Sequence, residues 1–486
     1  MEYGIICLLP IVVALALSFV TRDALLSLLV GCIIGIFILF GSDAIWGAKD
    51  PFRGLAALLQ EALGNADFIW VVCIEIFIGV LVAYFQKSGA IKAFSDKVEN
   101  LHLGRRGTET MAFALGIFIF FSDYFSPLYV GNVMRPLTDK AKASREFLAY
   151  VCDSTSSPIC CLVPFTSWGI YVAGVLAAIP EFCAAGGVEA ETQMASDLGQ
   201  QAVIHGFVFN FYCWAALILC GLLGCGVIPH YGPMRKAEKR AMETGQVYAE
   251  GSTPLLSGEL DAIKPNEGVK SSLFLDFLMP AVIIIGITVG TYVVIGSART
   301  LEAFIAAVIY QFVVIAVRKM ATVKQLMDTA VEGIKAVMAA ILILAMAYCI
   351  NWVTKQLGTA AYLVNLTEAW MTPFWLLTIT FLLGTVMSFL TGSSWGTYAI
   401  LLPIVIPLAL NIEGGVIGTC TYAAIAAVMG GGCFGDHCSP ISDTTILSSL
   451  AAGSDHVDHV KTQMPYAATA AALGLIGYII IGATLS

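Results

Sequence analysis

Four aspartates interrupt segments of the chain that are otherwise apolar: Asp123, Asp153, Asp436 and Asp443. A carboxylate is expensive in apolar surroundings, so each of these acids needs a partner or a function. A carboxyl group that binds a proton and a metal cation in turn exchanges one for the other, which is the chemistry of an antiporter. Asp443, between two hydroxyl-bearing residues, is the strongest single candidate.

Hydroxyl-rich sequence around two of these acids predicts helices that break within an apolar surrounding. One half-helix end at such a break exposes carbonyl groups that bind cations, and the other end exposes N–H groups that bind anions. Side-chain hydroxyls and carboxylates complete either kind of site. The residues predicted to bind an ion are Asp153, Ser156 and Ser157 in the first half of the chain and Asp436, Ser439, Ser442, Asp443 and Thr444 in the second half.

Two further polar interruptions, SDYFSP from Ser122 and TGSSWG from Thr391, predict the irregular tips of re-entrant hairpins. Such tips are tolerated only where they are buried in protein or line a cavity. With two tryptophans that follow Ser or Thr clusters, they supply the candidates for lining a substrate cavity: Asp123, Tyr124, Ser126, Trp168, Thr391, Ser393, Ser394 and Trp395. Asp123 suits an ammonium group and the second tip suits a carboxylate, although tryptophans in helices more often serve packing.

Other roles stay open for several of these acids. Asp153 and Asp436 also suit the N-cap of the half-helix that follows each of them. Asp123 also suits a structural salt bridge with Arg135. Glu75, in the middle of the apolar run VVCIEIFIGV, is either a proton carrier or faces a polar neighbour in the helix bundle.

Two histidine-containing clusters carry weaker signals. The spacing of Cys433, His437 and Cys438 matches no zinc motif, so we expect no transition metal at these residues. The metal ion that we expect the chain to bind is Na⁺, and we expect no cofactor. A second cluster suits a pH sensor, although a solvated turn is the better interpretation; it consists of Asp455, His456, Asp458 and His459. No phosphate-binding Gly-x-x-x-x-Gly-Lys loop occurs, so transport would draw on an ion gradient, and we expect no enzyme activity.

The elements that must hold these residues are membrane helices. The chain has 486 residues, of which 58% are hydrophobic and 12% charged, and its mean hydropathy is +0.85. Soluble globular chains are much less apolar, so most of this chain faces lipid. The net charge of −9 gives no reason to expect a nucleic-acid partner. Apolar runs of spanning length, about 20 residues, lie near 3–20, 24–41, 67–86, 202–228, 272–296, 336–354 and 464–485, with a shorter run at 302–317.

Matching parts of the sequence recur at a separation of roughly 270 residues. Ser-Pro-Ile occurs at 157–159 and again at 439–441. Basic residues flank the first hairpin, whereas no Lys or Arg lies between Lys355 and Lys461, so the two hairpins should enter from opposite sides. The predicted fold is an all-α polytopic membrane protein of two inverted repeats, each with about five crossings, a re-entrant hairpin and a broken helix. The first repeat covers 1–230, a cytoplasmic linker 231–270, and the second repeat 271–486.

At these residues the chain resembles the NhaC family of sodium/proton antiporters. The resemblance rests on GDHCSPISDTTILSS from Gly435, which is similar to that family's Gly-Asp-x-x-Ser-Pro-x-Ser-Asp-Thr-Thr signature. FSDYFSPLYVGNVMRPLTDK from Phe121 and DSTSSPICCLVPFTSWG from Asp153 support it. The resemblance implies Na⁺/H⁺ exchange in a bacterial inner membrane, a homodimer as in many relatives, and ion binding by Asp436, Ser439, Asp443 and Thr444.

The first half departs from a symmetric pattern, because Cys161 follows Pro158 at the distance at which Asp443 follows Pro440. Relatives of this kind also include sodium-coupled carriers, so transport or exchange of a small amino or organic acid is the alternative to Na⁺/H⁺ antiport. A channel or a purely structural protein is disfavoured, since a simple pore does not need two broken helices with buried acids. The expected partners are therefore Na⁺, H⁺, the lipid bilayer and either no organic solute or one small acid.

Overall fold

The structure is a computed structural model of the 486-residue chain. It describes residues 3–21, 24–40, 56, 59–64, 66–90, 93, 103–120, 123–164, 166–177, 179–189, 193–253, 263–266, 268, 270–295, 299–358 and 372–486. Ser122, which belongs to the predicted first tip, lies outside the described residues.

The described residues form an all-helical bundle, as the apolar sequence predicted. Its first half contains η1 (Gly4–Leu8), α1 (Leu9–Thr21), α2 (Ala24–Phe40), α5 (Ala66–Ser88), α7 (Arg105–Phe118), α8 (Phe125–Lys140), α9 (Arg145–Ser154), α10 (Ser157–Leu162), α11 (Ser167–Ala177), α12 (Pro180–Ala185), α13 (Gln193–Gly206), η2 (Phe207–Phe209) and α14 (Phe211–Gly224). The helix α15 (Gly232–Thr244) lies in the predicted linker. The second half contains the π-helical turn η3 (Leu273–Leu278), α17 (Met279–Ile295), α18 (Thr300–Val317), α19 (Val323–Gln356), α21 (Pro373–Thr391), α22 (Ser394–Ile412), α23 (Thr419–Cys438), α24 (Asp443–Ala452) and α25 (His456–Leu485).

Among the described residues, three unbroken helices are long and apolar enough to cross a membrane: Leu273–Ile295, Pro373–Thr391 and His456–Leu485. The apolar run predicted at 202–228 is not one straight crossing. It bends by 52° between Asp197–Phe209 and Phe211–Gly224, because the Asn210 side chain accepts the Cys213 N–H at 3.4 Å and starts a new helix there. The number of crossings in each half stays a prediction.

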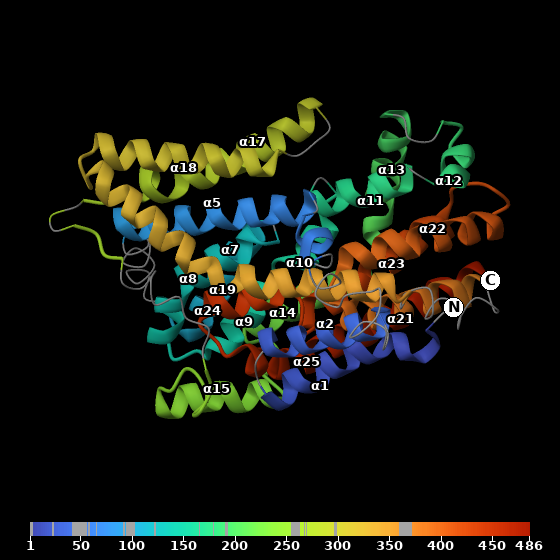
Figure 1. Ribbon diagram of the computed structural model, residues 1–486, viewed down its shortest axis with the longest axis horizontal. Coiled ribbons are helices and arrows are strands. Elements are labelled where there is room, and N and C mark those ends of the chain that lie inside the picture. Colours follow the sequence, from blue (N-terminus) through green and yellow to red (C-terminus); the bar gives the residue numbers. More distant parts are fainter. Residues whose placement is uncertain are drawn as a thin grey trace.

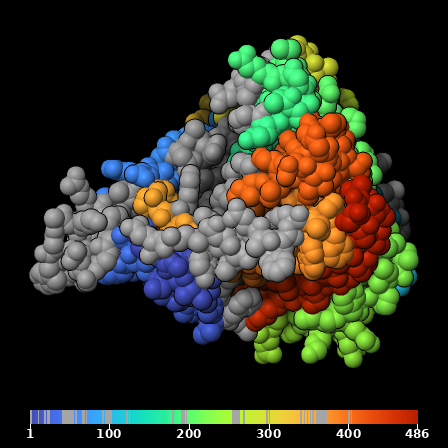
Figure 2. Space-filling view, turned by 90° about the vertical axis from the view of Figure 1, so that its right-hand side faces the viewer, coloured from blue at the N-terminus to red at the C-terminus, as the bar shows by residue number. Residues whose placement is uncertain are grey.

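The helices run mostly along the long axis of the molecule (Figure 1). In that view α17, α18 and α5 lie on one side of α19, and α1, α2 and α25 lie on the other side. Figure 2 looks along the long axis at the end where α22, in orange, lies below the green segments that include α12 and α13. The two ends of the chain lie toward this same end of the bundle.

The helix that carries Asp436 packs unusually close to its neighbour α21. At Gly435, a Cβ atom would come 2.1 Å from the Phe389 backbone nitrogen, so only glycine fits between the two backbones. Small residues permit such close approach of membrane helices, whose association depends on packing rather than on burial from water. This contact fixes the position of the adjacent aspartate.

Two helices are interrupted at the positions that the sequence singled out. The first interruption separates α9 from α10 at Thr155 and Ser156, and the second separates α23 from α24 at 439–442. The helix pairs α7 with α8 and α21 with α22 each pack together and carry the polar tips between them. The opposite orientation of the two halves in the membrane stays a prediction, as do the boundaries of the two repeats.

Candidate functional site

The second helix interruption holds Asp436 in a group of hydroxyls. Ser157 donates from Oγ to Asp436 Oδ2 at 2.6 Å, Thr444 donates to the same oxygen at 3.2 Å, and Ser442 donates to Oδ1 at 3.2 Å. Asp436 is only 2% exposed, and the three hydroxyl residues are fully buried. Asp436 therefore does not serve as an N-cap for α24, because its carboxylate binds hydroxyls rather than backbone N–H groups.

The hydroxyls of this group come from both halves of the chain. Ser157 begins α10, whereas Ser442 and Thr444 flank the start of α24. Their oxygens also lie within hydrogen-bond distance of one another, with Ser157 3.2 Å and Ser442 3.1 Å from Thr444 Oγ1. Carboxylate and hydroxyl oxygens at this density are the ligands that a hard cation prefers.

Asp443 lies beside this group and connects it to the first hairpin. Tyr124 donates its phenol O–H to Asp443 Oδ2 at 2.8 Å, and the Thr444 N–H donates to Oδ1 at 2.8 Å. Asp443 is half-buried whereas Asp436 is buried, so Asp443 is the more accessible of the two acids. Asp436 and Asp443 lie within electrostatic range of each other.

The tip of the first hairpin is held by an aromatic cluster. Trp168 donates its indole N–H to Asp123 Oδ2 at 2.6 Å, so this acid pairs with an indole rather than with Arg135. The Trp168 and Trp395 rings lie 5.1 Å apart between centroids. Ser126 Oγ donates to the Thr155 carbonyl at 3.4 Å, which ties the tip to the first helix interruption.

The hydroxyls of the second tip form hydrogen bonds with backbone groups. Thr391 donates to Met387 O at 2.8 Å, Ser393 caps α22 by accepting the Gly396 N–H at 3.4 Å, and Ser394 donates to Gly432 O at 3.4 Å. Ser439 similarly donates to Phe389 O at 2.8 Å. These predicted residues therefore support the second interruption, and their hydroxyls lie outside the group around Asp436.

Asp153 contacts side chains of α25. Gln463 donates its amide N–H to Asp153 Oδ2 at 3.0 Å, and His459 Nε2 lies 3.9 Å from the same oxygen. Asp153 does not cap α10, because it stands in the last turn of α9, and Ser156 Oγ donates to its carbonyl at 2.7 Å. Gln463 was not among the predicted site residues, and His459 was predicted to lie in a solvated turn; both are fully buried.

The cluster from Asp455 to His459 is not a solvated turn. His456 is 7% and Asp455 2% exposed. Asp455 caps α25 by accepting the Asp458 N–H at 3.0 Å, and His456 Nε2 lies 2.7 Å from the carbonyl oxygen of Pro440. The second helix interruption thus packs directly on this cluster, which the local sequence did not indicate because the contact depends on the fold.

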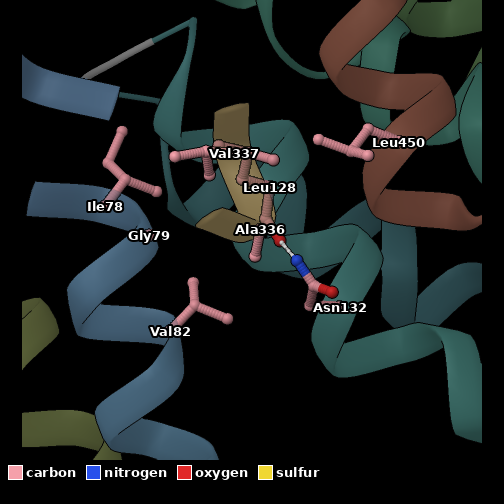
Figure 3. Close-up of a pocket in the computed structure, with 8 residues that line it drawn as sticks. All are labelled: Ile78, Gly79, Val82, Leu128, Asn132, Ala336, Val337 and Leu450. Atoms are coloured by element: carbon pink, nitrogen blue, oxygen red, sulfur yellow. Dashed lines mark hydrogen bonds between the residues drawn. The ribbon is translucent and has the colours of Figure 1, made fainter. Parts of the chain in front are cut away.

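Glu75 lies within α5 with its whole side chain buried. Neither carboxylate oxygen has a hydrogen-bond partner among the described residues, and Asp443 lies within electrostatic range. A narrow cavity adjoins the next turn of α5 and is lined there by Ile78, Gly79 and Val82 (Figure 3). Its volume of about 10 Å³ is close to what one water molecule needs.

The structure does not bring Cys433, His437 and Cys438 together as ligands of one metal ion. The His437 ring lies 2.7 Å from Tyr212 Oη and 2.9 Å from Ser154 Oγ, so both ring nitrogens have hydroxyl partners. Cys438 donates its S–H to Phe434 O at 3.0 Å. His437 is therefore a buried, hydrogen-bonded histidine that joins three helices.

The chain as a whole is similar to members of one transporter family. The profile described as the Na⁺/H⁺ antiporter family matches residues 159–483. An uncharacterized protein from Haemophilus influenzae is 33% identical over 99% of this chain and 91% of its own length. The Na⁺/H⁺ antiporter NhaC from Alkalihalophilus pseudofirmus is 30% identical over 31% of this chain and 32% of its own. The malate-2H⁺/Na⁺-lactate antiporter from Bacillus subtilis is 27% identical over 33% of each chain.

Proposed function

Because the chain belongs to the Na⁺/H⁺ antiporter family, we propose that it exchanges Na⁺ for H⁺ across a bacterial cytoplasmic membrane at the group around Asp436. The observation that carries the proposal is that one buried carboxylate accepts hydrogen bonds from hydroxyls of both halves of the chain. A site shared between the halves can change its access when the halves move relative to each other.

The two acids of this site take different parts in the exchange. With Na⁺ bound, Asp436 neutralises the ion, and the hydroxyl oxygens of Ser157, Ser442 and Thr444 replace part of its water shell. Asp443, which is more accessible, receives the incoming ion or proton and shares it with Asp436. When a proton occupies the site instead, the same pair of acids holds it, so the two cations compete for one place.

Glu75 is the candidate for carrying the proton between this site and solvent. Its carboxylate is buried without a hydrogen-bond partner among the described residues, and it lies near Asp443. An isolated buried carboxyl group is tolerated most easily when it carries a proton.

The test uses the purified protein in lipid vesicles that contain a pH-sensitive dye. Sodium is added outside, and lithium and potassium are added in parallel. We expect sodium to drive proton efflux in the wild type and no efflux in Asp443→Asn or Asp436→Asn. Glu302→Gln is the matched control, because Glu302 is 52% exposed and pairs with Arg299 away from the site; it should retain wild-type exchange.

A second function is favoured by the aromatic cluster that holds Asp123. Trp168, Trp395 and Tyr171 pack together beside this acid, and one relative is named as an exchanger of malate and lactate. Sodium-coupled exchange of a small amino or organic acid would use this wall. If sodium alone drives no proton movement and exchange begins only when such an acid is added, this second function replaces the first.

A further inference from the structure

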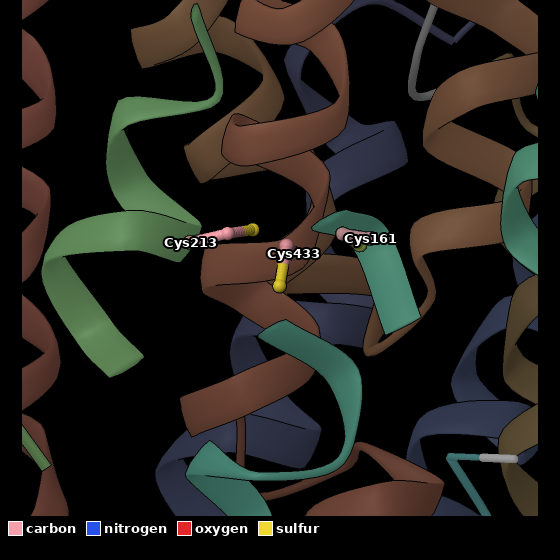
Figure 4. Close-up of side chains that lie close together, drawn as sticks. All are labelled: Cys161, Cys213 and Cys433. Atoms are coloured by element: carbon pink, nitrogen blue, oxygen red, sulfur yellow. The ribbon is translucent and has the colours of Figure 1, made fainter. Parts of the chain in front are cut away.

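Three cysteines from three separate helices meet in the core of the protein (Figure 4). Cys161 comes from α10, Cys213 from α14 and Cys433 from α23, and their sulfur atoms all lie within 4.8 Å of one another. The three side chains are at most 2% exposed. Since they are far apart in the sequence, no local spacing could have indicated the cluster.

The spacing of the three sulfurs suits a bound soft metal ion. An ion with metal–sulfur distances of about 2.3 Å holds three sulfurs of a trigonal plane about 4.0 Å apart. The sulfurs of this cluster need to approach by less than 1 Å to reach that arrangement. Thiolate ligands select soft ions such as Cu⁺ and bind Na⁺ poorly, so this cluster differs in preference from the oxygen-rich group around Asp436.

The cysteine cluster is buried among protein side chains, so it tolerates little net charge. Tyr398 Oη lies 3.4 Å from Cys161 Sγ and donates to the Met429 carbonyl at 2.9 Å. A monovalent ion bound by one thiolate and two neutral thiols has no net charge, which is the arrangement that a buried site tolerates best. Binding of one Cu⁺ then replaces one thiol proton, which is released to solvent.

We propose that Cys161, Cys213 and Cys433 form a binding site for Cu⁺, and that the bound ion links α10, α14 and α23 and stops transport. This revises the expectation from sequence that the chain binds no transition metal. The effect on transport rests on the proposed function, because α10 and α23 supply Ser157 and Asp436 to the exchange site. The binding itself does not depend on that function.

Binding is tested first, on the reduced full-length protein in detergent with ascorbate present. Cu⁺ is titrated in competition with a chromophoric Cu⁺ chelator. We expect one Cu⁺ per chain in the wild type and an affinity at least tenfold lower in Cys213→Ser. Cys220→Ser, on the same helix and equally buried, is the matched control and should keep wild-type affinity. Equal binding by the two variants, or loss of all Cu⁺ from the wild type to the chelator, overturns the proposal.

Two further measurements keep the proposal testable if a cysteine variant fails to fold. The thermal unfolding midpoint of the wild type should rise when Cu⁺ is added and stay constant when the same concentration of Na⁺ replaces it; no rise with Cu⁺ contradicts the site. In vesicles, Cu⁺ should inhibit wild-type exchange and spare Cys213→Ser, and equal inhibition of both contradicts the link between the three helices. A wild type that shows no sodium-driven exchange refutes the proposed function alone, since the titration still decides the Cu⁺ site.

Discussion

The two helix interruptions share a Ser-Pro-Ile sequence but hold their acids in opposite ways. At the second one, Asp436 binds the hydroxyl of Ser157 from the other half. At the first one, Asp153 faces α25, where Gln463 binds it. The first interruption thus supplies a hydroxyl to Asp436 while its own acid binds Gln463 of α25, and the second interruption supplies Asp436 and Asp443. The shared Ser-Pro-Ile sequence thus accompanies one group of a carboxylate and hydroxyls from both halves rather than two equivalent groups.

The same asymmetry appears three residues beyond each shared proline. Asp443 follows Pro440, whereas Cys161 follows Pro158. Asp443 receives hydrogen bonds from Tyr124 and from the backbone, and Cys161 lies among two other cysteines and Tyr398. Equivalent positions therefore carry a carboxylate in one half and a thiol in the other.

The largest effect should come from removing the charge of the acid that binds the three hydroxyls. Asp436→Asn leaves the hydroxyls of Ser157, Ser442 and Thr444 without an anionic acceptor and the cation without its neutralising charge. Hydrogen bonds to charged groups are worth roughly 1.5–3 kcal/mol each, so losing several lowers the exchange rate by at least about 100-fold. Sodium-driven proton efflux in vesicles measures this, and a rate within tenfold of wild type would show that Asp436 is not the ion ligand.

A smaller effect should follow from the same change at the buried acid of the first interruption. Asp153→Asn keeps the shape of the side chain and a hydrogen bond to Gln463. It leaves the three hydroxyls around Asp436 in place. The loss of one charge-assisted hydrogen bond corresponds to roughly tenfold in rate. If Asp153→Asn and Asp436→Asn reduce exchange equally, the two interruptions are functionally equivalent and the contrast drawn between them is wrong.

The helical fold and the two interruptions could be predicted because they depend on local sequence. Long apolar runs can satisfy their backbone groups only as helices in lipid, and Asp436 and Asp443 stand within one motif. The contacts of Gln463 and His459 with Asp153 join residues about 300 positions apart, so no local pattern indicates them. They were missed because the sequence around them resembles an ordinary turn followed by an apolar helix.

Single polar residues were also hard to interpret within apolar runs. Asn210 is one polar residue in a long apolar stretch, yet its side chain caps α14 and causes the bend that the sequence analysis did not expect. The cysteines gave no useful signal, since a buried thiol packs like a small apolar group. Which three of the fourteen cysteines meet is decided only by helix packing.

The neighbouring serines of the first interruption provide a finer comparison. Ser157 donates to the Asp436 carboxylate, whereas Ser156 donates to the carbonyl of Asp153 within its own segment. Ser157→Ala should raise the half-saturating Na⁺ concentration by roughly tenfold, because one hydrogen bond to a charged group is lost. Ser156→Ala should stay within about twofold, since a neutral local bond contributes less. A larger shift in Ser156→Ala would place the ion nearer to the first interruption.

The smallest effect on transport should come from the loop that supports the second interruption. Gly392 ends α21 with a φ of +65°, and a Cβ atom there would lie 2.5 Å from the carbonyl oxygen of Ile441, between Pro440 and Ser442. Gly358 has a φ of +67°, and no atom of the described residues lies within 4 Å of its Cβ position, so it is the matched control. A left-handed non-glycine residue costs about 1–2 kcal/mol, and both alanine variants should lose that much stability. Only Gly392→Ala should also displace Ile441 and raise the half-saturating Na⁺ concentration a few-fold. Thermal unfolding measures the loss of stability, and vesicle transport measures the change in the half-saturating Na⁺ concentration. Equal transport by both variants would mean that the second interruption tolerates displacement at Ile441 without disturbing Asp436 or Asp443.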